Sequence, residues 1–75
     1  MKKYMSHYEL SIWFHLTVAL VSKLCKEMAE LGEYGDFEKT RDFTKLVFVD
    51  AFEHYLKNGY AIKHGLDYKP YKEVE

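Results

Sequence analysis

Apolar residues recur along the first third of the chain at the spacing of a helix that packs lengthwise against another helix. They are separated alternately by four and three residues: Leu10, Phe14, Thr17, Val21, Leu24, Met28 and Leu31. This spacing is typical of a helix–helix seam. Ser6 is the expected N-cap, with Glu9 as its capping-box partner, and Gly32 is the expected stop. The pattern therefore predicts a helix over residues 6–31.

A second apolar series predicts a helix over residues 37–57. Its stripe comprises Phe37, Thr40, Thr44, Val47, Phe48, Ala51, Phe52 and Tyr55. Asp36 is the expected N-cap and Asn58-Gly59 the expected end. Residues 60–65 are expected to form a short third helix, and residues 66–75 an extended tail. The predicted fold is all-α: one domain over residues 1–75, built as an antiparallel two-helix hairpin with a short C-terminal helix.

Both predicted long helices carry more apolar residues than a lone hairpin can bury. The surplus widens the stripe of the first helix and forms a separate ridge, Leu46, Val49 and Leu56, on the second. Such surplus predicts association, and a homodimer that completes a four-helix bundle is the simplest closed arrangement. The residues expected to bind a partner are Ile12, Trp13, Leu16, Leu20, Leu46, Val49, Leu56, Tyr68 and Tyr71.

The tyrosines gather toward the two ends of the chain. Tyrosine offers a large contact area at small entropic cost and is enriched at interfaces. The segment Tyr68-Lys69-Pro70-Tyr71 is therefore a candidate partner-binding segment. The same rings would also serve to cap a thin core, and the sequence leaves both interpretations open.

Length and composition sharpen this picture. A chain of 75 residues buries only about 60% of its unfolded surface, and such small domains usually need a disulfide, a metal or a partner. Cys25 is the only cysteine, so an internal disulfide is excluded and a partner is the expected source of extra stability. The net charge of −1 gives no long-range attraction to nucleic acid.

The N-terminal region has some features of a signal peptide, because Lys2 and Lys3 precede an apolar run from Leu10 to Val21. Glu9 and His15 interrupt this pattern, and no small-residue cleavage site follows. The run is also shorter than the ~18 residues of a membrane span. We therefore expect a cytoplasmic protein without a membrane segment.

The sequence contains no recognisable catalytic or metal-binding motif. The four histidines and Cys25 show neither a helical i, i+4 pair nor a CxxC, so no metal site and no cofactor are predicted. Asp50 and His54 have i, i+4 spacing, but an exposed ion pair is a simpler interpretation than an acid–base pair. Cys25 is better explained by packing than by reactivity. We expect no enzymatic activity and no small-molecule substrate.

These observations favour a non-enzymatic protein–protein interaction module. The chain would dock on a larger protein as an inhibitor or adaptor, and its Lys-, Tyr- and Phe-rich composition suggests a phage or mobile-element protein by association alone. One alternative is a dimeric DNA-binding transcriptional regulator. Its recognition helix would use Lys39, Arg41 and Lys45, although Glu38 and Asp42 lie among them. Another alternative is a structural subunit of a larger assembly.

Overall fold

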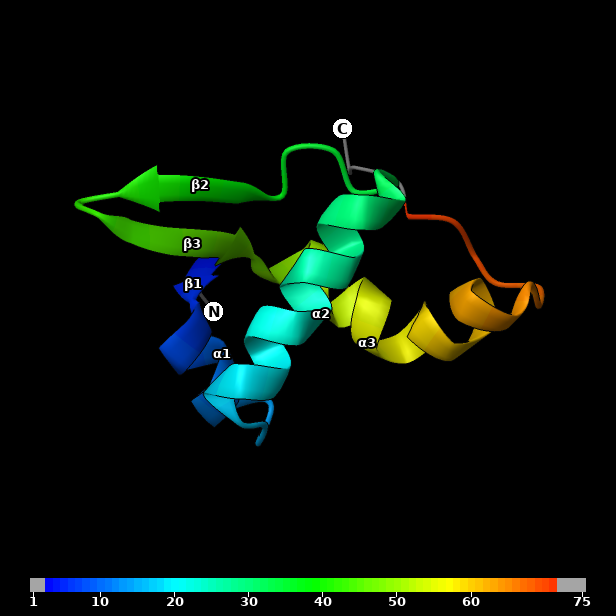
Figure 1. Cartoon of the computed structure of the whole chain (residues 1–75), viewed down its shortest axis with the longest axis horizontal. Helices are drawn as coiled ribbons and strands as arrows, with labels where there is room; N and C mark the ends of the chain where they lie inside the picture. Colours follow the sequence, from blue (N-terminus) through cyan, green and yellow to red (C-terminus); the bar gives the residue numbers. More distant parts are fainter. Residues whose placement is uncertain (1–2, 72–75) are drawn as a thin grey trace.

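A three-stranded antiparallel sheet lies beside three helices in the computed structural model, which describes residues 3–71 (Figure 1). The elements are, in order, β1 (Tyr4–Ser6), α1 (His7–Trp13), α2 (Val18–Leu31), β2 (Glu38–Arg41), β3 (Thr44–Phe48) and α3 (Val49–His64). The predicted all-α class and helical bundle are therefore wrong, and the fold is α+β. Lys2 of the signal-like region and residues 72–75 of the predicted tail lie outside the described residues.

The predicted helix over residues 6–31 is two helices joined by a tight turn. Its start is confirmed: Ser6 and Glu9 form the reciprocal capping box. The break follows Trp13, where His15 adopts a left-handed φ of 57°. The His15 N–H donates to the Ile12 carbonyl and the Leu16 N–H to the Ser11 carbonyl, which is a Schellman motif without its usual glycine.

The second helix, α2, begins at a new cap and ends where expected. The Thr17 side chain accepts a hydrogen bond from the Leu20 N–H, so this residue caps a helix and is exposed instead of lying in a seam. Gly32 ends α2 in the left-handed conformation, as predicted. The turn changes the direction of the chain between α1 and α2. The apolar residues spaced by four and three from Leu10 to Leu31 therefore do not share one buried face, and Leu31 is exposed.

The predicted helix over residues 37–57 is wrong up to Phe48, because this part forms a β-hairpin. β2 pairs with β3, which also pairs with β1, so that β3 is the central strand. The two residues at the tip, Asp42 and Phe43, both have positive φ, which is the signature of a type I′ turn. Asp36 consequently precedes a strand and is no N-cap.

The third helix, α3, continues through the predicted stop at Asn58-Gly59. It runs to His64 and ends at Gly65, whose φ is 67°. The predicted short third helix over residues 60–65 is thus the last part of α3. No helix within residues 3–71 is long and apolar enough to cross a membrane.

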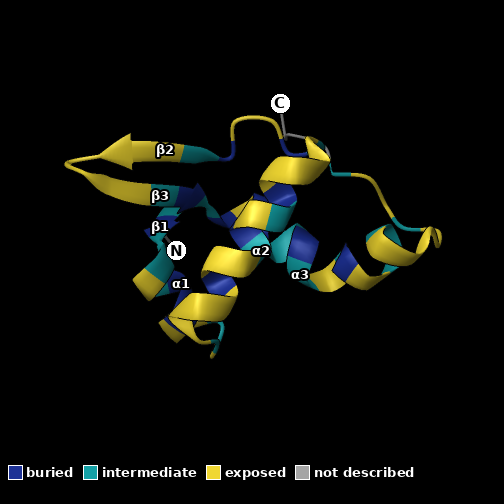
Figure 2. Ribbon diagram, in the orientation of Figure 1, coloured by how far each residue is buried: buried dark blue, intermediate teal, exposed yellow. Residues whose placement is uncertain are grey.

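The core lies where the sheet, α2 and α3 meet (Figure 2). Phe52 is fully buried on α3, and its ring lies 5.5 Å from that of Phe14. The other buried apolar residues are Met5, Leu10, Val21, Cys25, Met28, Tyr34, Phe37, Val47, Val49, Ala51 and Tyr55. This arrangement leaves the outer side of α1 and the start of α2 uncovered.

Candidate functional site

Figure 2 shows much of α1 and the start of α2 coloured as exposed. Several of the exposed residues there are apolar. Of the nine exposed large hydrophobic residues found within residues 3–71, five lie between residues 8 and 20. Ile12 and Trp13 are 58% and 52% exposed, respectively. We call this group the α1–α2 apolar surface; it comprises Tyr8, Ile12, Trp13, Val18 and Leu20.

Local structure explains why these residues face solvent. Tyr8 and Ile12 are i, i+4 neighbours on α1, whereas Leu10 of the same helix points into the core. The Schellman turn ends α1 directly after Trp13, and α2 then begins at Val18. A continuous helix would have carried these side chains on one rod, whereas the turn divides them between the end of α1 and the start of α2.

The nine predicted partner-binding residues occupy different environments. Ile12, Trp13 and Leu20 are exposed and belong to the α1–α2 apolar surface. Val49 is buried in the core. The remaining five, Leu16, Leu46, Leu56, Tyr68 and Tyr71, are half-buried. Of the predicted set, the structure therefore leaves only Ile12, Trp13 and Leu20 exposed.

The ridge expected on the second helix is divided between two elements. Leu46 belongs to β3, whereas Val49 and Leu56 belong to α3. Leu56 packs against the core of its own chain, with Val49 among the core residues. These residues therefore do not form a common helical face.

The C-terminal segment of residues 66–71 is held against the rest of the chain. The Tyr68 hydroxyl donates to Glu33 Oε1 at 2.5 Å, and the Tyr71 N–H donates to Glu33 Oε2 at 3.4 Å. The Tyr71 ring lies 5.2 Å from that of Tyr34. Of the two roles that the sequence left open for these tyrosines, the structure shows them packed on their own domain.

His54 of α3 contacts this segment through one ring nitrogen and Tyr34 through the other. Nε2 lies 2.6 Å from the Lys69 carbonyl oxygen, and Nδ1 lies 2.7 Å from the Tyr34 hydroxyl. Because a carbonyl can only accept, Nε2 donates to Lys69; in a neutral imidazole Nδ1 then accepts from the Tyr34 hydroxyl. His54 is thereby a structural crosslink between α3, Tyr34 and the C-terminal segment.

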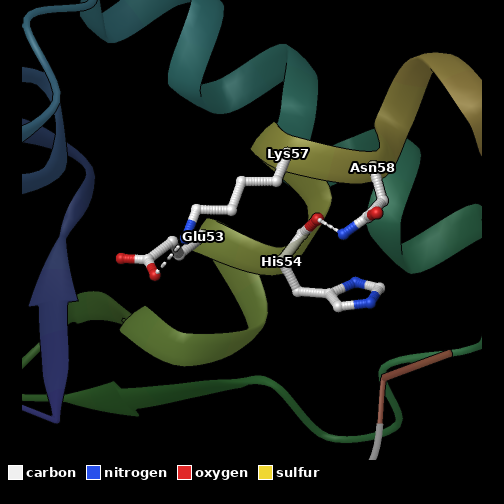
Figure 3. A network of polar contacts seen from close by, with 4 residues as sticks. All are labelled: Glu53, His54, Lys57 and Asn58. Atoms are coloured by element: carbon white, nitrogen blue, oxygen red, sulfur yellow. Dashed lines mark hydrogen bonds and ion pairs between the residues drawn. The ribbon is translucent and has the colours of Figure 1, made fainter. Parts of the chain in front are cut away.

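Around His54, α3 carries a set of local polar contacts (Figure 3). The Asn58 amide donates to the His54 carbonyl at 2.9 Å, and Lys57 Nζ pairs with Glu53 Oε1 at 3.2 Å. Asp50 is exposed, while both ring nitrogens of His54 bond to other groups. A cleft lies here, lined in part by Asp50, Glu53 and Pro70. The hydrogen bonds of the His54 ring thus connect α3 to Tyr34 and to Lys69 of the C-terminal segment.

A second polar cluster joins α1, α2 and β2. One nitrogen, sulfur or carboxylate oxygen atom from each of His7, Cys25 and Glu38 lies within 4.8 Å of the others. His7 Nδ1 is 3.0 Å from Ser22 Oγ. Burial raises the pKa of the Cys25 thiol to about 12; Glu38 adds to this effect and Lys45 opposes it. These three residues are the group within residues 3–71 with the geometry to hold a metal ion.

No metal-binding motif in the sequence marks this cluster, because its members come from three elements. Metal motifs are recognised by spacing along one helix or loop, whereas this cluster depends on the packing of α1 against α2 and on the position of β2. Tyr8 and Val18 of the α1–α2 apolar surface were also missed. Their exposure depends on the helix break at His15, which no glycine marks.

The basic residues considered for DNA recognition lie on the β-hairpin instead of a helix. Lys39 and Arg41 belong to β2 and Lys45 to β3, and all three are exposed. Lys39 Nζ lies 3.9 Å from the ring centroid of Tyr4. The recognition helix that the DNA-binding alternative required is therefore absent from this part of the chain.

Comparisons with known proteins add no relationship to this picture. No protein-family model, no curated protein and no solved structure matches the chain.

Proposed function

We propose that this chain is a non-enzymatic protein–protein interaction module that docks through the α1–α2 apolar surface. The observation that carries the proposal is the exposure of Ile12 and Trp13 beside three further exposed apolar side chains. Contiguous exposed apolar groups mark interaction sites in soluble proteins, and tryptophan is enriched among residues that dominate binding energy.

The partner of this surface is another protein chain, and a second copy is the simplest one. A two-fold dimer would place two α1–α2 apolar surfaces against each other, because such an interface uses the same patch on both subunits. The roles of inhibitor or adaptor and an origin in a phage or mobile element are supported by composition alone. A cytoplasmic location is supported by the single, buried cysteine.

Trp13 fluorescence provides a direct measurement of association, because Trp13 is the only tryptophan of the chain. Light scattering at micromolar concentration is expected to give twice the monomer mass, and Trp13 emission should shift to shorter wavelength as concentration rises. Ile12→Ser should abolish both effects while leaving helicity intact. Leu31→Ser is the matched control, since Leu31 is 44% exposed at the far end of α2 and should leave association unchanged.

A chain that stays monomeric at all concentrations excludes the dimer and leaves a different protein as the partner. A photo-crosslinking residue at position 8 in native cells would then capture that protein. The proposal is wrong if neither self-association nor the captured partner depends on Ile12.

DNA binding is the competing function, and the hairpin now offers its best-placed basic residues. A two-stranded ribbon can enter a major groove, but Glu38 and Asp42 lie beside Lys39 and Arg41. Weak heparin retention at low salt, unchanged by Arg41→Gln, is expected if the chain binds proteins. Retention that falls steeply with salt and is lost in this variant would favour the regulator.

A further inference from the structure

The cluster of His7, Cys25 and Glu38 has the composition and spacing of a transition-metal site. His7 begins α1, Cys25 lies within α2, and Glu38 begins β2. His7 Nε2 is 3.6 Å from Glu38 Oε2. Tetrahedral zinc has bonds of about 2.0–2.3 Å, which places neighbouring ligand atoms about 3.3–3.8 Å apart. Small side-chain rotations would therefore bring all three atoms onto one ion.

The imidazole of His7 is arranged as a metal-binding histidine would be. Nδ1 lies 3.0 Å from Ser22 Oγ, whereas Nε2 is buried and has no hydrogen-bond partner. When Nδ1 donates to Ser22, Nε2 carries its lone pair toward Cys25 and Glu38. Ligating histidines are typically oriented by such a hydrogen bond from the other ring nitrogen. A buried nitrogen without a partner is costly, and a metal ion would remove this cost.

Cys25 and Glu38 complement each other in charge and position. Cys25 is only 3% exposed, so its thiolate would be poorly stabilised by water. A bound dication displaces the thiol proton and compensates the charge of both the thiolate and the nearby carboxylate. The proton is released to solvent, so binding should strengthen as pH rises.

We propose that His7, Cys25 and Glu38 bind a single zinc ion, with water completing the coordination. One nitrogen, one sulfur and one oxygen ligand suit borderline-soft zinc, whereas magnesium and calcium prefer oxygen alone. The ion would join α1, α2 and β2 in a chain that has no second cysteine for a disulfide. Small domains commonly gain stability in this way. The site does not depend on the α1–α2 apolar surface or its partner.

Calorimetry on the untagged 75-residue chain, first treated with a chelator, tests this proposal. Zinc is expected to bind with one ion per chain and to raise the thermal midpoint, because the ion binds the folded state. Cobalt in place of zinc should produce a thiolate-to-cobalt charge-transfer absorption. Magnesium should produce no heat and no change in the midpoint.

Two variants of the proposed zinc ligands and one control variant test whether zinc binding depends on these residues. Glu38→Gln retains side-chain size at a half-buried position and should weaken zinc binding by about tenfold or more. Cys25→Ala should abolish the charge-transfer absorption. Glu30→Gln, on an exposed position of α2, should bind zinc as the unaltered chain does.

The outcomes separate the zinc site from an ordinary ion pair. Circular dichroism of the metal-free variants establishes that each is folded, and Glu38→Gln keeps the test valid if Cys25→Ala unfolds. The proposal is overturned if the folded chain binds no zinc, or if Glu38→Gln and Cys25→Ala both retain full affinity. His7 would then be only a neighbour of Glu38, with its Nε2 3.6 Å from Glu38 Oε2.

Discussion

The two ends of the molecule treat their aromatic side chains in opposite ways. At the α1–α2 end, Trp13 remains 52% exposed. At the other end, Tyr34 is only 3% exposed and lies near the rings of Phe37, Tyr55 and Tyr71. Both ends are rich in apolar residues, so apolar content alone does not determine which side chains the fold covers.

The difference follows from polar groups that fasten one segment over another. Glu33 accepts hydrogen bonds from Tyr68 and Tyr71, and His54 donates one to the Lys69 carbonyl. These bonds hold residues 66–71 beside Tyr34. A further link, from the Tyr55 hydroxyl to Glu27 at 2.6 Å, joins α3 to α2. At the α1–α2 end Tyr8, Ile12 and Trp13 stay exposed within residues 3–71, and the docking surface proposed above lies there.

The largest expected difference between the two ends is in stability. Tyr34→Ala should lower the free energy of unfolding by about 3–5 kcal/mol, because it removes a buried ring. Trp13→Ala should cost less than about 1 kcal/mol in the monomer, since the side chain is half exposed. Urea unfolding at a concentration where the chain is monomeric measures both. Equal losses would mean that the α1–α2 apolar surface is part of the core.

Alkaline pH should weaken the covered end selectively. Burial raises the pKa of Tyr34 and of Tyr55 above the ordinary value of 10.0, and the hydrogen bond to Glu27 adds to the effect on Tyr55. The folded state thus holds these protons more tightly than the unfolded chain does. Their contribution is complete below about pH 10 and is lost as pH rises further.

Urea midpoints measured from about pH 8 to 11 should therefore fall above pH 10. Tyr55→Phe should flatten this dependence, because one of the two buried phenols no longer titrates. An unchanged slope in Tyr55→Phe would show that the alkaline loss arises elsewhere.

A smaller effect is expected from loosening the C-terminal segment. Glu33→Gln keeps the shape of the side chain but removes the charge that accepts hydrogen bonds from Tyr68 and Tyr71. It should weaken attachment of residues 66–71 by about 1 kcal/mol. Hydrogen exchange at the Tyr71 amide and proteolytic cleavage in this segment should both accelerate, whereas Glu30→Gln should change neither.

Local signals predicted parts of this fold correctly. The Ser6–Glu9 capping box and the Gly32 stop were readable because each depends on residues close in sequence. Val47 and Phe48, one β-branched and one aromatic, favour a strand, but the helix-compatible spacing of the surrounding apolar residues concealed this signal. The hairpin also lacked the usual Asn-Gly turn, since Asp42 and Phe43 adopt its positive φ angles.

The sheet and the His7 cluster depended on contacts between distant segments. β1 pairs with β3 through Met5 and Val47, which no local pattern connects. The cluster of His7, Cys25 and Glu38 unites residues of α1, α2 and β2, so it depends on the packing of elements distant in sequence. The surplus of apolar residues in the sequence predicted that Ile12 and Trp13 would be exposed. The turn at His15, which ends α1 beside them, was not predicted.

The smallest expected effect is a gain at the turn that creates the exposed end. His15 holds a left-handed φ of 57°, which costs a non-glycine residue about 1 kcal/mol, and glycine adopts it freely. His15→Gly should therefore raise the urea midpoint slightly while leaving Trp13 as exposed to a fluorescence quencher as before. Thr17→Ala, which removes the cap of α2, should lower the midpoint by a similar amount. A loss of stability in His15→Gly would contradict the Schellman turn, because a residue in a continuous helix is destabilised by glycine.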